Sequence, residues 1–341
     1  MPSFCSNDYL GLAALPAPAG AAGAGASRLI AGDHAEHHAL EQRLATWLGA
    51  ESALLFTSGY AANVGAIGAL ARPGDLLVSD ALNHASIIDG ARLSRAKTVI
   101  VPHLDLSAVA DALAEYARGG SGRAWVVVES YYSMDADGPD LRRLREVCDD
   151  GGAALVVDEA HALGVLGPGG RGRAAEAGIR PDVLVGTLGK ALGSQGAFVA
   201  GHPTLRAWLW NRARSFVFST GLAPVSALAA LRSLDRLEEF PDLGRAVLAR
   251  AEELRAALRD GGLSPLGFGH IVPLVVGAPE SAVRAARALA DVGIDVQAVR
   301  PPTVAEGTSR LRMTVSAAHS AEDVARAARA VGDVLGGRRF T

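Results

Sequence analysis

Up to about residue 200, short apolar runs alternate with longer segments in which apolar residues recur every three or four positions. The runs at 53–56, 125–128 and 154–157 have the length of buried strands and lack the polar alternation of a half-solvated strand. The segment 37–48 instead carries leucines and a tryptophan at helical spacing. This alternation predicts a mostly parallel sheet covered by helices on both faces.

The character of the chain changes after residue 221. Residues 223–259 are predicted to be mainly helical, with an interruption near Pro241. The remainder predicts a smaller α+β domain with strands 271–276, 294–299 and 310–316 and helices 280–291 and 320–335. We expect an N-terminal arm at 1–32, a large domain at 33–238 and a small domain at 239–341. The arm is rich in proline, alanine and glycine, and that composition taken alone indicates a flexible segment.

Charge and cysteine content exclude several classes of protein. The 33 Lys and Arg residues nearly balance the 36 Asp and Glu residues, with no long run of one sign, so binding to nucleic acid or a membrane surface is not expected. No apolar stretch reaches the roughly 18 residues that span a bilayer. The only cysteines are Cys5 and Cys148, which makes a disulfide framework or a zinc site improbable and favours a cytoplasmic protein.

Polar residues with catalytic chemistry follow three of the predicted buried strands. Lys190 lies between glycines just after the run 183–185, Ser133 follows the strand at 125–128, and Asp158 and His161 follow the one at 154–157. The ends of parallel strands meet at one edge of a sheet, where open α/β sheets bind their ligands. An amine in a desolvated pocket is a nucleophile that forms Schiff bases. A carbonyl-bearing cofactor is therefore expected, and pyridoxal phosphate is the obvious candidate.

Three further positions allow a functional and a structural interpretation. The turn at Ser58 and Gly59 opens a helix whose N-terminus suits a phosphate, although such turns often serve only as caps. His84 follows another strand end, but a lone histidine there is more often a cap or a packing residue. Arg310 and Arg312 share one face of the last strand, which fits either a solvated edge or a carboxylate-binding site.

Six motifs in one order resemble the α-oxoamine synthases, which are fold-type I pyridoxal-phosphate enzymes. The resemblance covers almost the whole chain and is specific because all the motifs occur at compatible spacings. It implies a large domain with a mostly parallel seven-stranded sheet and a smaller α+β domain. The motifs are Asn7-Asp8-Tyr9-Leu10-Gly11, Ser58-Gly59-Tyr60-Ala61-Ala62-Asn63, His84-Ala85-Ser86, Glu129-Ser130 with Ser133-Met134-Asp135, Asp158-Glu159-Ala160-His161 and Thr187-Leu188-Gly189-Lys190-Ala191.

The resemblance implies a role for each matching residue. Lys190 would hold the cofactor as an imine and would also be the base that takes the Cα proton of the amino acid. Asp158 would pair with the protonated pyridine nitrogen, and His84 would stack on the ring. The remaining implied contacts are Ser58, Gly59, Tyr60 and Thr187 with the phosphate, joined by Thr220 of a second subunit, then His161 and Ser133 near the phenolic oxygen, and Arg312 with Asn7 at the substrate α-carboxylate.

The segment from Arg300 to Arg312 is similar to members of the family that act in biotin biosynthesis. This similarity implies a homodimer that condenses L-alanine with pimeloyl-CoA or a pimeloyl-acyl-carrier protein, giving 8-amino-7-oxononanoate, CO2 and free thiol. The alternatives are a relative that joins glycine or serine to another acyl-CoA, and a non-catalytic dimeric scaffold. The pair Pro301-Pro302 argues against glycine-using relatives, whereas intact Lys190 and Asp158 argue against a scaffold.

Two features depart from the family pattern. Only six residues precede Asn7, whereas relatives carry a leading segment near the acyl site, so we expect a more open acyl site that tolerates several chain lengths. Phe218 occupies a position where tyrosine is common. The first departure bears on acyl-donor specificity rather than on the cofactor chemistry.

Overall fold

The computed structural model describes residues 1–336, which divide into two compact units. The larger unit contains residues 12–131 and 138–239, and the smaller unit contains residues 1–11, 132–137 and everything described from Phe240 onward. The predicted division into an arm and two domains differs from these units, because the first eleven residues and the loop 132–137 belong to the smaller one. Whether the arm and the two predicted domains are independent folding units is not tested by this division, so the predicted boundaries stay a prediction.

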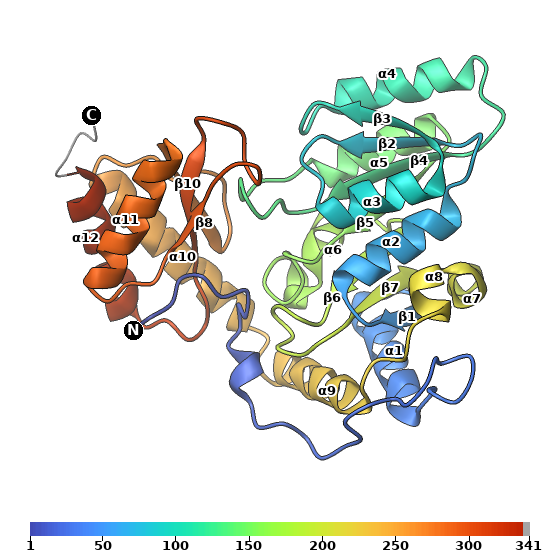
Figure 1. Ribbon diagram of the computed structural model, residues 1–341, viewed down its shortest axis with the longest axis horizontal. Coiled ribbons are helices and arrows are strands. Elements are labelled where there is room, and N and C mark those ends of the chain that lie inside the picture. Colours follow the sequence, from blue (N-terminus) through green and yellow to red (C-terminus); the bar gives the residue numbers. More distant parts are fainter. Residues whose placement is uncertain (337–341) are drawn as a thin grey trace. The chain divides into compact units, whose positions relative to one another are not determined.

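A seven-stranded sheet forms the centre of the larger unit (Figure 1). All pairs among β2 to β6 are parallel, and β7 runs antiparallel to both of its neighbours, β1 and β6. The mostly parallel sheet is therefore confirmed, although the sequence analysis did not single out β7. In spatial order the strands are β1 (Ser52–Phe56), β7 (Ala197–Gly201), β6 (Val183–Thr187), β5 (Ala153–Asp158), β4 (Ala124–Glu129), β2 (Leu76–Asp80) and β3 (Lys97–Val101).

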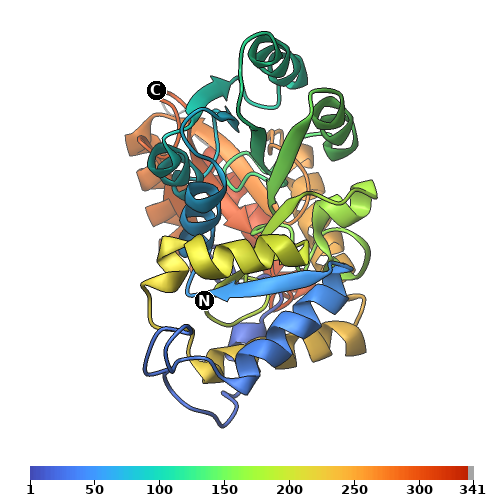
Figure 2. The same cartoon turned by 90° about the vertical axis from the view of Figure 1, so that its right-hand side faces the viewer.

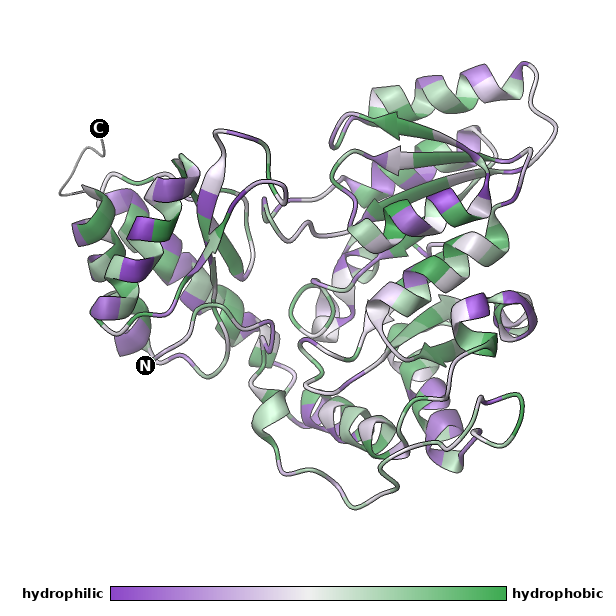
Figure 3. Ribbon diagram, viewed as in Figure 1, coloured by the Kyte–Doolittle hydropathy of each residue, from purple (hydrophilic) through white to green (hydrophobic). Residues whose placement is uncertain are grey.

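Helices cover both faces of this sheet. Successive strand residues point to opposite faces and belong to two different apolar clusters, so each face needs a covering layer. In β4, Trp125 and Val127 join one cluster, whereas Val126 and Val128 join the other. Figure 3 shows that most residues of these strands are apolar, and Figure 2 shows α1 and α7 on opposite sides of β1. The helices of this unit are α1 (Ala35–Leu48), α2 (Gly59–Leu70), α3 (Ala85–Ser94), α4 (Leu106–Ala117), α5 (Leu141–Asp150), α6 (Gly172–Ala177), α7 (Pro203–Arg212), α8 (Arg214–Val217) and α9 (Pro224–Glu239).

The end of the Pro/Ala/Gly-rich segment is held by a buried charge cluster. The Arg28 guanidinium pairs with the Glu41 carboxylate of α1 and lies 5.0 Å from the ring centroid of Trp210. Glu41 also accepts hydrogen bonds from Arg206 Nη2 at 2.9 Å and from the Leu55 amide of β1 at 3.0 Å. The flexible-arm interpretation does not anticipate this anchor, because Arg28 is only 4% exposed.

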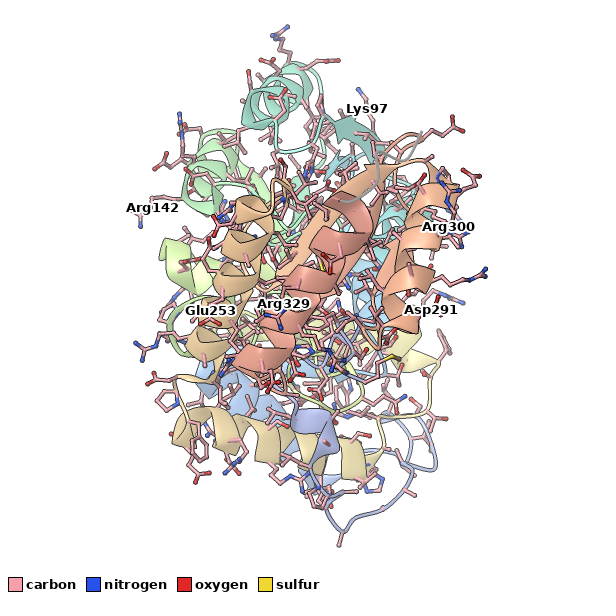
Figure 4. All side chains as sticks on the ribbon, turned by 90° about the vertical axis from the view of Figure 1, so that its left-hand side faces the viewer. Lys97, Arg142, Glu253, Asp291, Arg300 and Arg329 are labelled. Carbon is pink, nitrogen blue, oxygen red and sulfur yellow. The ribbon has the colours of Figure 1, made fainter. Side chains whose placement is uncertain are left out.

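The smaller unit is a three-stranded antiparallel sheet packed against three helices. The inward-facing residues of β10, including Leu311 and Met313, are fully buried in its core together with Phe4. Charged side chains of its helices, such as Glu253 and Arg329, lie on the outer surface (Figure 4). Its elements are β8 (Ile271–Gly277), β10 (Ser309–Thr314) and β9 (Gln297–Val299) in spatial order, with α10 (Leu243–Asp260), α11 (Pro279–Asp291) and α12 (Ala321–Gly336).

The predicted absence of a transmembrane segment agrees with the helix lengths and hydropathy. Within residues 1–336, no helix combines the length and the apolar character needed to cross a bilayer.

The predicted break near Pro241 is observed, since α9 ends at Glu239 and α10 begins at Leu243. Proline lacks an amide proton and clashes with the preceding turn, which explains the position of this break.

The charge cluster predicts a large effect of removing its central carboxylate. Replacing Glu41 with Gln removes one of the two carboxylates that pair with the buried Arg28, since Asp33 stays 2.7 Å from its Nε atom. The loss of this charge should lower the free energy of unfolding by about 1.5–3 kcal/mol. Urea denaturation followed by circular dichroism measures this change. The matched control, Glu36→Gln in the first turn of the same helix, should cost less than about 1 kcal/mol because Glu36 is only partly buried. Equal losses in the two variants would contradict the anchoring role of Glu41.

Candidate active site

The carboxyl ends of β4, β5 and β6 bring the predicted polar residues to one edge of the large sheet. Glu129 and Asp158 are the last residues of β4 and β5 and are register partners. Thr187 ends β6, and Lys190 lies three residues beyond it. Parallel pairing thus confirms that these strand ends meet at a common edge, as expected for a ligand site in an open α/β sheet.

Lys190 lies in a tight turn between β6 and β7. The Leu188 amide donates to the Gly196 carbonyl at 2.9 Å, and the Ser194 amide donates to the Leu188 carbonyl at 2.9 Å. This turn leaves Lys190 half-buried and sets its Nζ atom 2.8 Å from Nε2 of His161, which follows β5. The amine and the imidazole are therefore close enough to share a proton.

Asp158 is buried and held through both of its carboxylate oxygens. Oδ2 accepts a hydrogen bond from Asn63 Nδ2 at 2.6 Å, and Oδ1 accepts one from the Ala160 amide at 2.8 Å. Asn63 lies on α2, is 2% exposed, and also donates to Ser86 Oγ at 3.0 Å. No role was expected for Asn63, although it ends the motif that begins at Ser58 and is a polar residue inside a helix of small and apolar residues.

His84 serves as the N-cap of α3 and is tied to the end of β4. Its Nδ1 accepts from the Ser86 amide at 3.2 Å, so the capping interpretation is confirmed. Its own amide donates to Glu129 Oε1 at 2.7 Å, a contact that the sequence did not reveal. Burial lowers the pKa of the His84 imidazole, which favours a neutral ring. Burial, assisted by the nearby Asp158 charge, raises the pKa of Glu129 to about 8.

The N-terminus of α2 has the chemistry of an anion site. Ser58 caps the helix by accepting from the Ala61 amide at 3.1 Å, and the amides of Gly59 and Tyr60 lie in the first helical turn. A Cβ added to Gly59 would lie 3.8 Å from Thr187 Oγ1, so the end of β6 adjoins this helix terminus. Tyr60 is half-exposed, and its hydroxyl bonds to Asp89.

The predicted carboxylate-binding residues meet in the smaller unit. Arg312 Nε donates to the Ser133 carbonyl at 2.7 Å, and Nη2 donates to Asn7 Oδ1 at 3.2 Å. Arg310 pairs with Asp135 at 2.6 Å, and both arginines are 5% exposed. The solvated-edge interpretation of this strand face is therefore wrong. Arg310 holds the loop that carries Ser133, a function that its position in the sequence did not indicate.

Thr220 takes part in none of the contacts described above and, like Ser58 and Tyr60, is exposed. It lies in the connection between α8 and α9. Phe218, which departs from the family pattern, is 74% exposed in the same connection. Both side chains are accessible on the surface of the larger unit.

Curated relatives match the chain over nearly all of its length. The family model for aminotransferase class I and II matches residues 2–331. The 8-amino-7-oxononanoate synthase of Anaeromyxobacter dehalogenans strain 2CP-1 is 49% identical, with 94% of this chain and 83% of the relative covered. The enzyme of the same name from Mycolicibacterium smegmatis is 47% identical, with 97% of this chain and 88% of the relative covered.

Solved structures of serine palmitoyltransferases and of an 8-amino-7-oxononanoate synthase also resemble the fold of this chain. A Sphingomonas wittichii serine palmitoyltransferase superimposes with a TM-score of 0.92 at 30% identity, covering 98% of this chain and 87% of that one. The 8-amino-7-oxononanoate synthase of Francisella tularensis gives a TM-score of 0.82 at 25% identity, covering 98% of both chains. A serine palmitoyltransferase with pyridoxal phosphate, at 28% identity, gives a TM-score of 0.93 and covers 98% of this chain and 87% of that one. The chain thus belongs to the aminotransferase class I and II family, as a pyridoxal-phosphate-dependent transferase of the α-oxoamine synthase group.

Proposed function

We propose that this chain condenses L-alanine with a pimeloyl thioester and releases CO2 and the free thiol, giving 8-amino-7-oxononanoate for biotin synthesis. The thioester is carried by coenzyme A or an acyl-carrier protein. The observation that carries the proposal is the Lys190 amine beside His161, at the same sheet edge as the buried Asp158 carboxylate. The relatives from Anaeromyxobacter dehalogenans and Mycolicibacterium smegmatis, both named 8-amino-7-oxononanoate synthase, support this choice of substrates.

The residues at the sheet edge fit pyridoxal phosphate group by group. The Lys190 amine suits the aldehyde, and a carboxylate fixed through both oxygens, as in Asp158, suits a protonated pyridine nitrogen. The N-terminus of α2, with Ser58 and the Thr187 hydroxyl beside it, suits the phosphate. We assign the ring face to His84, and assign the phenolic oxygen to His161 and Ser133.

The proposed chemistry divides between the cofactor and the side chains. When bound, pyridoxal phosphate is an electron sink that makes the alanine Cα proton acidic. The Lys190 amine removes that proton, and His161, 2.8 Å away, can take or return a proton at Nζ. Asp158 keeps the pyridine nitrogen protonated, since a carboxylate held in place needs no reorganisation during the reaction. The charged Arg312 guanidinium binds the alanine carboxylate, and Asn7 orients the guanidinium.

The bonds and leaving groups follow from the substrates. The alanine Cα attacks the thioester carbonyl carbon, a C–C bond forms, and the C–S bond breaks to release the thiol. The departing thiol carries the proton that Lys190 took from Cα. The α-carboxylate then leaves as CO2, and a second proton, taken up from water, returns to Cα through the Lys190 amine. A glycine- or serine-using synthase would follow the same steps, and the serine palmitoyltransferase structures make that the leading alternative. A non-catalytic scaffold is the remaining alternative, and the half-buried Lys190 beside His161 argues against it.

A homodimer with composite sites is part of the proposal. Thr220 is exposed, and several large apolar side chains on the larger unit are exposed as well, including Leu82, Ile88 and Phe218. Exposed apolar and aromatic side chains of this kind are often buried in the core of homodimer interfaces. We therefore assign Thr220 to the phosphate of the partner subunit's site. The free thiols of Cys5 and Cys148 are compatible with the reducing cytoplasm, where we place the reaction.

The first prediction tests the reaction itself. The purified protein with pyridoxal phosphate, L-alanine and pimeloyl-CoA or pimeloyl-acyl-carrier protein should release thiol and CO2 and form a product with the mass of 8-amino-7-oxononanoate. Lys190→Ala should lose this turnover by at least about 10³-fold, because the base and the imine-forming amine are the same group. Faster turnover with glycine or serine and a long-chain acyl-CoA would select the alternative, and no turnover with any pair would favour a scaffold.

The second prediction concerns Glu129, whose oxygen holds the His84 amide. Its pKa is raised from 4.5 to about 8, so the folded protein binds more protons than the unfolded chain in this interval. The contribution of Glu129 to stability is therefore complete below about pH 4.5 and is lost as the pH rises toward 8.

Glu129→Gln keeps an acceptor oxygen but cannot ionise. The test is denaturation of the cofactor-free protein at pH 5 and at pH 8. Between these pH values the wild type should lose more free energy of unfolding than the variant does, and the two losses should differ by more than about 1 kcal/mol. The control Glu115→Gln, at an exposed position on α4, should retain the wild-type pH dependence. Identical pH dependence in wild type and Glu129→Gln would show that Glu129 is ionised throughout this interval.

The third prediction tests the shared site. Lys190→Ala and Thr220→Val should each be nearly inactive as homodimers. In an equal mixture that exchanges subunits freely, about half of the dimers are heterodimers, and one site of each has both an intact Lys190 and an intact Thr220 from its partner. The mixture should therefore recover about a quarter of the wild-type activity, and the isolated heterodimer about half. Mixing Lys190→Ala with the double variant Lys190→Ala/Thr220→Val is the control and should recover nothing. Heterodimers that form without recovered activity would place Thr220 in the site of its own chain.

A further inference from the structure

A cavity lies in the larger unit at the amino ends of β4, β5 and β6, the edge of the sheet opposite to Lys190. Its volume is about 610 Å³, within the usual range for small-molecule sites. The starts of β4, β5 and β6 line it through Trp125, Ala154 and Val183, together with the end of α2 and the first half of α7. Since β4, β5 and β6 are parallel, none of the residues at their carboxyl ends belongs to this cavity.

The floor of the cavity is apolar and fixed. Trp125 is 6% exposed, and Leu70 and Leu205 pack against the same core cluster. One wall is the indole of Trp208, which is 45% exposed and is oriented by a 2.8 Å hydrogen bond from Nε1 to the Ala69 carbonyl. A half-exposed indole next to a leucine-lined floor offers an apolar surface to a ligand with a hydrocarbon or aromatic body.

Two arginines at the rim give the cavity a positive charge. A buried carboxylate fixes their backbones, because Asp75 accepts from the Arg72 amide at 3.2 Å and from the Arg123 amide at 2.9 Å. Among residues 1–336, no ion pair joins either guanidinium to a carboxylate. Both side chains are exposed and line the cavity.

The acidic residue of the lining does not cancel this charge. Asp182 accepts hydrogen bonds from Arg145 Nη1 and from the Leu155 amide, each at 2.7 Å, so its carboxylate is already compensated. The cavity therefore combines an apolar floor with two cationic groups at one side. An anionic head with an apolar body is complementary to this arrangement, whereas a cationic amphiphile is not.

We propose that this cavity binds a small amphiphilic anion, with its carboxylate or sulfonate at Arg72 and Arg123 and its apolar body against Trp125, Leu205 and Trp208. The site is separate from the edge that carries Lys190 and does not depend on the proposed reaction. Its ligand class is defined by one negative charge and a hydrocarbon or aromatic body that fits about 610 Å³.

The test uses the cofactor-loaded protein and the fluorescent sulfonate 8-anilinonaphthalene-1-sulfonate as the probe. We expect one saturable site per chain, competition by decanoate and no competition by decylamine. Arg72→Gln/Arg123→Gln should weaken probe and decanoate binding by about tenfold or more, since charge-assisted hydrogen bonds to the anion are lost. The matched control Arg118→Gln/Arg143→Gln removes two exposed charges that do not line the cavity and should leave both affinities unchanged.

Hydrogen exchange locates the bound molecule. Decanoate should slow amide exchange at the end of α2 and in α7, and leave exchange around Lys190 unchanged. The proposal is overturned if the two double variants lose affinity equally, if decylamine competes as well as decanoate, or if protection appears only around Lys190. Because none of these readouts measures turnover, a failure of the proposed reaction would leave the result unaffected.

Discussion

The parallel pairing of β4, β5 and β6 is the constraint on which the active edge depends. It places Glu129, Asp158 and Thr187 at the ends of neighbouring strands, where their side chains leave an apolar sheet and face a common space. A carboxylate at such a position loses hydration and must be compensated by fixed donors. Asn63 and the Ala160 amide provide this compensation for Asp158, so the helix that opens at Ser58 is linked to the strand that ends at Asp158.

The sequence was informative wherever function and fold impose the same pattern. Continuous apolar runs followed by polar residues predicted the parallel strands and the edge that carries Lys190, because both strand faces are buried. The motifs then identified the family, which composition and periodicity alone could not do. The residues at 271–276 also predicted a strand of the smaller sheet as a continuous apolar run, and those at 310–316 predicted another through alternation with a buried core face.

Long-range contacts between polar side chains escaped prediction for a physical reason. Asn63, Glu129 and Arg310 act through partners that are distant in sequence, and a single polar residue carries no periodic signal of its partner. The short β7, with the sequence Ala-Phe-Val-Ala-Gly, carries too weak an apolar pattern to be identified as a strand, and its antiparallel direction depends on pairing rather than on residue pattern. The Pro/Ala/Gly-rich segment was interpreted as flexible because its composition gives no signal that Arg28 pairs with Glu41 on the following helix.

The reversal of the chain between β6 and β7 has a mechanical consequence for the lysine that it carries. Because Thr187 pairs with Ala197 at the start of this reversal, both ends of the connecting segment are held by hydrogen-bonded strands inside the sheet. Hydrogen bonds from Leu188 and Ser194 close the turn further. The main chain at Lys190 is thus held in place, and the Nζ atom can move only by rotation about the bonds of its own four-carbon side chain. Exchange of substrate and product must then be accommodated by elements outside this turn.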